Sequence, residues 1–282
     1  MLARLAIPLA ALAVALVAAL ASVSAAAQAS ATADPAARTG TSHVLGADIS
    51  WPQCPKGTGI PSRQGEGKPM PQAGTDFVVV GLTNGPGFYP NPCLAAQVRW
   101  VKQHHVHAAA YAMTTYPTAD RIRRHGDDGP HSHRYVHGRL FNTGFAEAQF
   151  NVATMEKVDL DVPFVWVDVE PYPVAPWSSS RSQNAAVVQG AVRGYEKAGL
   201  RVGFYSTQSL WAQVVGGLHY GYPEWRTAGQ TSMASALDKC STYPIQGGRA
   251  VIAQWWSLDR DFDVACPGRW TRADRTRFFH RY

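Results

Sequence analysis

The chain has 282 residues, of which 46% are hydrophobic, and a formal charge of +6. This charge suits contact with anionic wall polymers or membrane surfaces, although a bias toward arginine in the composition explains it equally well. No aromatic stacking platform or known motif accompanies the basic residues, which argues against nucleic acid as a partner.

The N-terminal segment has the pattern of a secretory signal peptide. Arg4 precedes an uncharged apolar run from Leu5 to Leu20, and small residues suitable for cleavage follow at 25–27 and 29–31. We therefore expect a signal peptide over 1–33, a flexible leader over 34–43 and one domain over 44–282. The alternative is a retained membrane anchor, because the apolar run approaches spanning length.

Within the domain, strand-like and helix-like stretches alternate. Strands are predicted at 44–51, 77–84, 107–115, 162–170, 201–206, 224–228, 250–256 and 261–265. Helices are predicted at 92–104, 139–157, 180–198, 207–215 and 231–239. Such alternation indicates parallel strands joined by crossover helices. The expected fold is an α/β, TIM-like (β/α) barrel, irregular because it has fewer helices than strands.

Two long segments interrupt this alternation. Residues 55–74 are rich in glycine and proline, and residues 117–138 are rich in arginine, histidine and glycine. Long loops at the carboxyl ends of strands often shape a site, but they can equally be plain surface.

The chain has four cysteines, an even number that suits a disulfide-bonded exported protein. Three connectivities are possible, and we favour the sequential one, Cys54 with Cys93 and Cys240 with Cys266. No pair has the C-x-x-C spacing, so a zinc cluster built on cysteine is not expected.

The stretch 162–170 is the most informative in the chain. An apolar, β-branched run ends there in two carboxylates, Asp168 and Glu170, which share one face of the strand with Trp166. The carboxyl ends of parallel strands form the functional face of a barrel. Two acids at such a position suit a carboxylate pair that acts on a glycosidic bond.

Further acids and aromatic residues occur near other strand ends. Asp48 lies in the first strand, just before Trp51, and Asp263 lies in the last strand, after Trp255 and Trp256. Four acids with tryptophans nearby suggest a sugar-binding cleft. For each acid the alternative is a structural role, and about half of the tryptophans are expected to be plain core.

These motifs resemble glycoside hydrolase family 25, the Chalaropsis-type lysozymes. The resemblance rests on Gly-Ala-Asp-Ile-Ser-Trp at 46–51, Val-Asp-Val-Glu at 167–170, Gly-Phe-Tyr-Ser at 203–206, and Gln-Trp-Trp at 254–256 followed by Asp263. A set of exported actinobacterial proteins with a domain of that superfamily is more similar still. They share D-x-S-W-P-Q-C (48–54), N-P-C-L (91–94) and the terminal D-x-D-x-x-C (261–266).

The resemblance implies a role for each matching residue. Glu170 is expected to be the general acid, and Asp168 is expected to stabilise positive charge on the sugar or to orient a substrate acetamido group. Asp48 and Asp263 are expected to hold this array. The expected substrate-binding residues are Trp51, Trp166, Tyr111, Tyr205, Trp255 and Trp256.

The resulting hypothesis is a secreted or cell-wall-associated, monomeric glycosidase that acts on envelope glycan of the peptidoglycan type. Neither a cofactor nor a metal is expected, because the clustered histidines have no acid at ligand spacing. A membrane is expected as a partner only if the N-terminal segment is retained. Two alternatives stay open: a silent glycan-binding protein on the same barrel, and a structural envelope protein whose acids only satisfy the barrel mouth.

Overall fold

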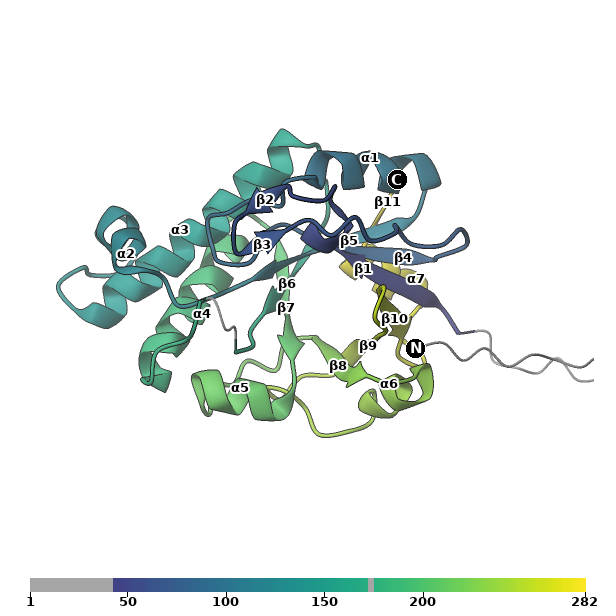
Figure 1. Ribbon diagram of the computed structural model, residues 1–282. Coiled ribbons are helices and arrows are strands. Elements are labelled where there is room, and N and C mark those ends of the chain that lie inside the picture. Colours follow the sequence, from purple (N-terminus) through teal and green to yellow (C-terminus); the bar gives the residue numbers. More distant parts are fainter. Residues whose placement is uncertain (1–42, 172–174) are drawn as a thin grey trace, which may run out of the picture. The chain divides into compact units, whose positions relative to one another are not determined.

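The structure, a computed structural model, describes residues 43–171 and 175–282 (Figure 1). The expected signal peptide and almost all of the expected leader lie outside these residues. Within the described residues, no helix has the length and apolar character needed to cross a membrane.

Eight strands form a closed barrel, which confirms the predicted fold class. They are β1 (Leu45–Ile49), β4 (Phe77–Gly81), β5 (His107–Met113), β6 (Phe164–Asp168), β7 (Arg201–Ser206), β8 (Glu224–Gln230), β9 (Ala250–Trp256) and β10 (Asp261–Ala265). Their order is β5-β4-β1-β10-β9-β8-β7-β6, and pairing of β6 with β5 closes the ring. All eight correspond to strands predicted from the sequence.

One strand runs against the prediction. β10 is antiparallel to both of its neighbours, β1 and β9, so the expectation of parallel strands throughout is wrong for the last strand. Its four-residue connection from β9 is too short for a crossover, which needs a dozen or more residues, and allows only a hairpin. The start of β10, and not its end, therefore lies at the carboxyl ends of the other strands.

Side chains of alternating residues form two apolar layers. One cluster contains Val78, Val80, Val165 and Val167 together with residues of the helices. The residues next to them in sequence belong to a second cluster, inside the barrel. The interior cluster includes Phe77, Val79, Phe164, Trp166, Trp225 and Ile252.

Glycine makes room for the interior rings. A Cβ on Gly46 would lie 2.3 Å from the Phe77 ring, and one on Gly203 would lie 2.6 Å from Trp166. Side chains at these two strand positions would displace the rings that fill the barrel.

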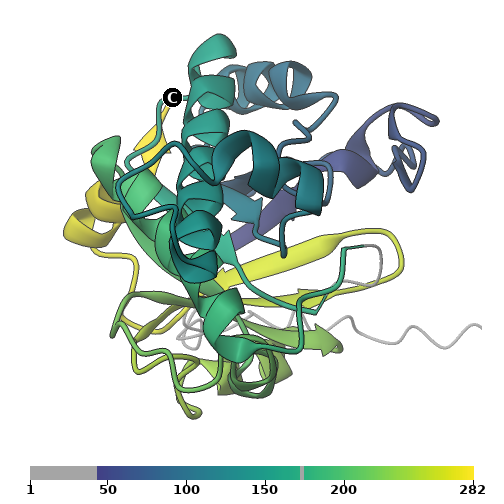
Figure 2. The same ribbon diagram turned by 90° about the vertical axis from the view of Figure 1, so that its left-hand side faces the viewer.

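In the described part of the chain, seven helices surround the barrel: α1 (Leu94–His104), α2 (Ala119–His125), α3 (Val136–Lys157), α4 (Arg181–Lys197), α5 (Gln208–Val215), α6 (Met233–Lys239) and α7 (Arg272–Phe278). The sequence predicted all but α2 and α7. In Figure 2 the teal α3 and the green α4 lie against each other. Gly144 and Gly190 permit this approach, because a Cβ on either would lie about 2 Å from a carbonyl oxygen of the other helix.

Both interrupting segments contain structure. Residues 55–74 include a short hairpin, β2 (Gly59–Ile60) and β3 (Arg63–Gln64), and residues 117–138 include α2. A final short strand, β11 (His280–Arg281), pairs with β5. The hairpin follows a 3₁₀ turn at Trp51–Gln53, directly after β1.

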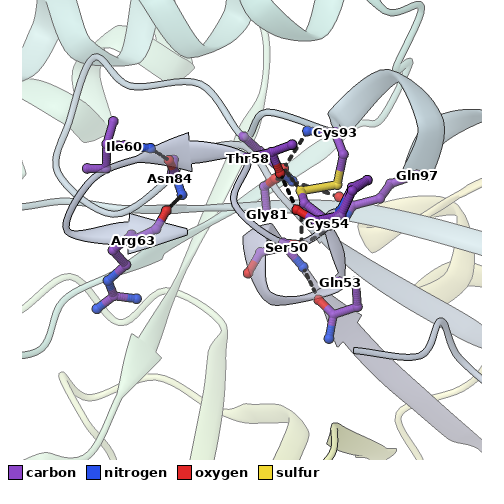
Figure 3. Close-up of a disulfide and its surroundings, with 12 residues drawn as sticks. Ser50, Gln53, Cys54, Thr58, Ile60, Arg63, Gly81, Asn84, Cys93 and Gln97 are labelled. Atoms are coloured by element: carbon purple, nitrogen blue, oxygen red, sulfur yellow. Dashed lines mark hydrogen bonds between the residues drawn. A yellow bond between two sulfur atoms is a disulfide. The ribbon is translucent and has the colours of Figure 1, made fainter. Parts of the chain in front are cut away.

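The structure contains both of the sequential disulfides. Cys54–Cys93 joins the turn after β1 to the start of α1 (Figure 3). Cys240–Cys266 joins the end of α6 to the residue after β10.

Removal of the second disulfide is expected to destabilise the barrel. The double variant Cys240→Ala/Cys266→Ala releases a loop with a sequence separation of 26 residues. In the chain-entropy model this costs about 3–4 kcal/mol of unfolding free energy. Urea unfolding of the oxidised protein and of the double variant measures the difference, and a loss below about 1 kcal/mol would contradict the expectation.

Candidate active site

Five acids converge at one end of the barrel. Asp48 comes from β1, Asp168 ends β6, Glu170 lies two residues later, and Asp261 and Asp263 come from β10. Asp48, Asp168 and Asp263 are 6%, 3% and 0% exposed, whereas Glu170 and Asp261 are partly exposed. Three acids of the cluster are therefore buried, and solvent can reach the other two.

The reversed direction of β10 changes the place of Asp263. Asp263 pairs in register with Gln254 and Gly46, inside the barrel, while Asp261 opens the strand opposite Trp256. The sequence analysis placed Asp263 near a strand end at the mouth, and this is corrected. Asp261 occupies that position instead.

Hydrogen bonds tie the buried acids to side chains from other strands. The Tyr205 hydroxyl donates to Gln254 Oε1 at 2.7 Å, and Gln254 Nε2 donates to Asp48 Oδ2 at 2.8 Å. Trp225 Nε1 donates to Asp263 Oδ1 at 2.8 Å. Buried polar groups need such partners to offset the loss of water.

Two carboxylate oxygens are left without a partner. Asp168 Oδ1 and Asp263 Oδ2 are buried and accept no hydrogen bond from the described residues. An ionised carboxylate is costly in that position, whereas a protonated one is much less so.

The pKa of every acid in the cluster is raised. Burial is the main cause in each case, and repulsion from neighbouring carboxylates adds to it for Asp48 and Asp168. The pKa of Asp261 rises to about 6, and that of Glu170 rises through burial against the opposing charge of Arg63. The cluster therefore retains protons toward neutral pH, and partly exposed Glu170 can offer one to a ligand.

Arg63 is a cation that acts on both members of the acid pair, Asp168 and Glu170. Its guanidinium carbon lies 5.0 Å from the centre of the Trp51 ring. The β2–β3 hairpin that carries Arg63 is held by Asn84, shown in Figure 3. Asn84 Oδ1 accepts from Ile60 N at 2.8 Å, and Asn84 Nδ2 donates to Arg63 O at 3.1 Å.

The expected aromatic residues divide into two groups. Four of them lie with the acids: Trp51, Tyr111, Tyr205 and Trp256. Trp51 lies beneath Arg63, and Trp256 pairs with Asp261 on the neighbouring strand. The pKa values of Tyr111 and Tyr205 are raised by burial and also by the charges of the acids. Trp166 and Trp255 do not lie there.

Trp166 is 0% exposed and packs with Phe164 and Trp225 below Asp168. Trp255 faces the opposite side of its strand and stacks on Phe262 with a centroid distance of 5.2 Å. Trp166 therefore belongs to the packed interior of the barrel, and Trp255 belongs to a separate apolar cluster.

Four residues of the site were missed by the sequence analysis: Arg63, Trp225, Gln254 and Asp261. Three of them had a signal, because Trp225 and Gln254 alternate with outward residues in predicted strands, and Asp261 stands two residues before Asp263. Arg63 had none. The described residues contain no cluster of three or more His, Cys, Asp or Glu side chains arranged to hold a metal.

Comparison with known proteins agrees with this geometry. The family described as "Lysozyme-like protein 1" matches residues 119–231, which include β6 and its two acids. Over 63 residues the chain is 33% identical to a probable GH family 25 lysozyme 4 of Dictyostelium discoideum. That match spans 22% of this chain and 28% of the relative.

Solved structures superpose on most of the chain. The chain superposes on a bacterial lysozyme from Streptomyces coelicolor with a TM-score of 0.54 and 18% identity, covering 84% of this chain and 99% of that one. It superposes on the modular Cpl-1 endolysin, complexed with a peptidoglycan analogue, with a TM-score of 0.51 and 17% identity. That match covers 79% of this chain and 54% of the endolysin. At these identities the likeness establishes the fold.

Proposed function

We propose that the chain, whose barrel resembles those of glycoside hydrolase family 25 lysozymes, is an exported glycosidase that cleaves peptidoglycan-type glycan of the cell envelope. One observation carries the proposal: a partly exposed acid with a raised pKa, Glu170, stands beside the buried Asp168 at the barrel mouth. This is the pair of carboxylates that cleavage of a glycosidic bond requires.

In the proposed reaction Glu170 donates its proton to the leaving glycosidic oxygen. Asp168 stabilises the positive charge that develops on the sugar ring, or orients a substrate acetamido group that attacks from within the substrate. Asp48 holds the array through Gln254 and Tyr205, and burial, with added repulsion from neighbouring carboxylates, raises the pKa of Asp168 and Asp48.

Export is supported by the two disulfides, which persist in oxidising compartments. The N-terminal pattern of 1–33 points the same way. The proposed partner is glycan outside the cell or in its wall, with the protein acting as a monomer, without a nucleic acid and without a cofactor.

A silent glycan-binding protein is the second candidate, and Arg63 favours it, because this cation acts on both acids of the pair. However, among the described residues the five acids are acted on by only two cations, Arg63 and the Lys68 that acts on Asp261. Neutralisation is therefore incomplete, and protons must supply the rest.

Turnover separates the two candidates. Purified protein is incubated with purified peptidoglycan, and new reducing ends and soluble fragments are measured. Release of fragments with new reducing ends supports the hydrolase. Sedimentation of the protein with peptidoglycan without any release supports the binding protein. If the protein neither releases fragments nor sediments with peptidoglycan, both candidates are overturned.

Arg63 is expected to set the pH range of hydrolysis. Its positive charge lowers the pKa of both Glu170 and Asp168, so its removal in Arg63→Met raises both. In this variant Asp168 ionises only at higher pH, and Glu170 also loses its proton only at higher pH. The whole bell-shaped profile of kcat/KM against pH is expected to move to higher pH.

Arg63→Lys is the matched control, because it keeps the charge and is expected to keep the profile close to that of the wild type. A profile in Arg63→Met that stays in place or moves to lower pH would contradict this role.

A further inference from the structure

A cavity of about 810 Å³ lies beside the acid cluster. Its walls come from the tip of the β2–β3 hairpin, the loop between β4 and α1, the segment after β5 with α2, and α3. Ile60, Pro61 and Ser62 line it, and the next residue of the hairpin, Arg63, acts on Asp168 and Glu170. The hairpin tip is therefore a wall shared by the cavity and the acid cluster.

Glu147 of α3 lies in the wall of this cavity and is buried without a hydrogen bond to its Oε1 from any described residue. The residue is 2% exposed, and it is in none of the ion pairs of the described residues. Burial raises its pKa to about 8, against the charge of Arg121. At neutral pH the group is mainly a carboxylic acid, which can donate one hydrogen bond and accept another.

The space in front of Glu147 depends on a glycine. A Cβ on Gly87 would lie 2.3 Å from Glu147 Oε2. Any larger residue at position 87 would force the carboxyl group to move, so the loop between β4 and α1 leaves the acid room at the cavity wall.

Arg121 of α2 supplies a cation against aromatic rings. Its guanidinium carbon lies 4.8 Å from the centre of Phe88 and 5.5 Å from that of Tyr89. In contrast to Arg124, which pairs with Asp120 at 2.9 Å, Arg121 has no ion pair with a described acid. Its charge is available to an anion in the cavity.

The ring of Phe88 is held in place at some backbone cost. Phe88 has a φ of +64°, a left-handed conformation that is unfavourable for a bulky side chain. It stacks on His125 with a centroid distance of 4.5 Å, and it is 7% exposed. Strained residues that packing holds in place concentrate at ligand sites.

We propose that this cavity is a second ligand site, which binds an acidic sugar of the envelope glycan. The anionic group of that sugar, a carboxylate or a phosphate, pairs with Arg121. The ring lies against Tyr89 and Tyr116, and a hydroxyl or amide oxygen of the sugar accepts a hydrogen bond from Glu147. The inference rests on the proposed function in taking the ligand to be glycan, but binding here does not require cleavage.

Binding is tested by calorimetry with three probes: a glucuronate-containing tetrasaccharide, its carboxyl-reduced counterpart, and a phosphorylated sugar of the same ring. The full chain with Glu170→Gln is used, so that cleavage cannot interfere. The acidic tetrasaccharide is expected to bind at least about tenfold more tightly than the reduced one, the scale of one charge-assisted contact. If the phosphorylated sugar binds more tightly than the glucuronate-containing tetrasaccharide, phosphate is the preferred anion.

Arg121→Gln is expected to remove this preference and to leave the carboxyl-reduced probe unaffected. Arg193→Gln, an exposed arginine on α4, is the matched control and should keep the preference. Gly87→Ala, which crowds Glu147, should weaken all three probes. Equal affinity for the acidic and reduced probes, or a preference that survives Arg121→Gln, would overturn the proposal. A charge preference at Arg121 without any peptidoglycan hydrolysis by the wild type would uphold this site while the proposed function fails.

Discussion

Replacement of Glu170 by Gln is expected to lower kcat for peptidoglycan hydrolysis by about 10²–10⁴-fold, the usual contribution of a general acid. The amide has the size of the carboxylic acid but cannot transfer a proton to the leaving oxygen. Glu170 is the partly exposed member of the acid pair, and its raised pKa keeps it protonated. Reducing-end release at saturating glycan measures the effect, and KM should change little because shape and hydrogen bonding are retained.

Glu156→Gln is the control for this variant. Glu156 is an exposed acid on α3, and its replacement makes the same change of side chain away from the barrel mouth. Activity in Glu156→Gln should equal that of the wild type, whereas equal activity in Glu170→Gln would remove Glu170 from the mechanism. The thermal unfolding midpoints of both variants show whether a loss of activity has a trivial cause in folding.

The strands of the barrel were predictable, because their apolar residues are β-branched or aromatic and are bounded by turn residues. The direction of β10 was not predictable in the same way. Alternation along Asp261–Ala265 is identical for a parallel and an antiparallel strand. Only the short connection after Trp256 indicated the direction of β10, and the expected fold did not take its length into account.

The segments that the sequence did not resolve are those held by distant residues. The β2–β3 hairpin has two-residue strands, too short for an alternation pattern, and its tip depends on Asn84, more than twenty residues later. α2 has seven residues and buries none of them, so no apolar stripe marks it. Arg63 lies on the hairpin and Arg121 lies on α2. Because the sequence analysis predicted neither segment, neither arginine was a candidate site residue.

The acids were found because an isolated carboxylate in an apolar strand is conspicuous. Asp48 and Asp168 are such residues, and both are buried in the barrel. Tryptophan gives no comparable signal, because a core ring and a ring in a cleft have the same neighbours in sequence. Trp166 fills the barrel interior, while Trp51 lies at its mouth beside Arg63.

A second variant with a large expected effect lies on the outer face of β8. Glu224 and Arg226 of β8 form an ion pair at 2.7 Å, with side chains 0% and 7% exposed. Glu224 also accepts hydrogen bonds from the backbone N–H groups of Ile245, Gln246 and Gly248. Arg226 donates to the carbonyl oxygens of Lys239, Thr242 and Gly248. Together the two side chains fix the loop between α6 and β9.

Arg226→Met is expected to cost about 3–5 kcal/mol of unfolding free energy, because it leaves the buried carboxylate of Glu224 without its cation. Three carbonyl oxygens lose their donor at the same time. Urea unfolding measures the loss. Arg226→Lys should recover only part of it, since one ammonium group cannot reproduce the planar fork of the guanidinium. A loss below about 1 kcal/mol would show that the loop is held without the pair.

The same variant tests the two faces of β8 separately. Glu224 and Arg226 flank Trp225, which lies in the barrel interior with the acids, so the ion pair lies on the opposite, outer face of the strand. Arg226→Met should therefore lower stability and leave the pH profile of any remaining hydrolysis unchanged, while Arg63→Met should shift the profile. A pH shift in Arg226→Met would mean that the Glu224–Arg226 pair also determines the protonation of the acid cluster, and would contradict the assignment of that control to Arg63.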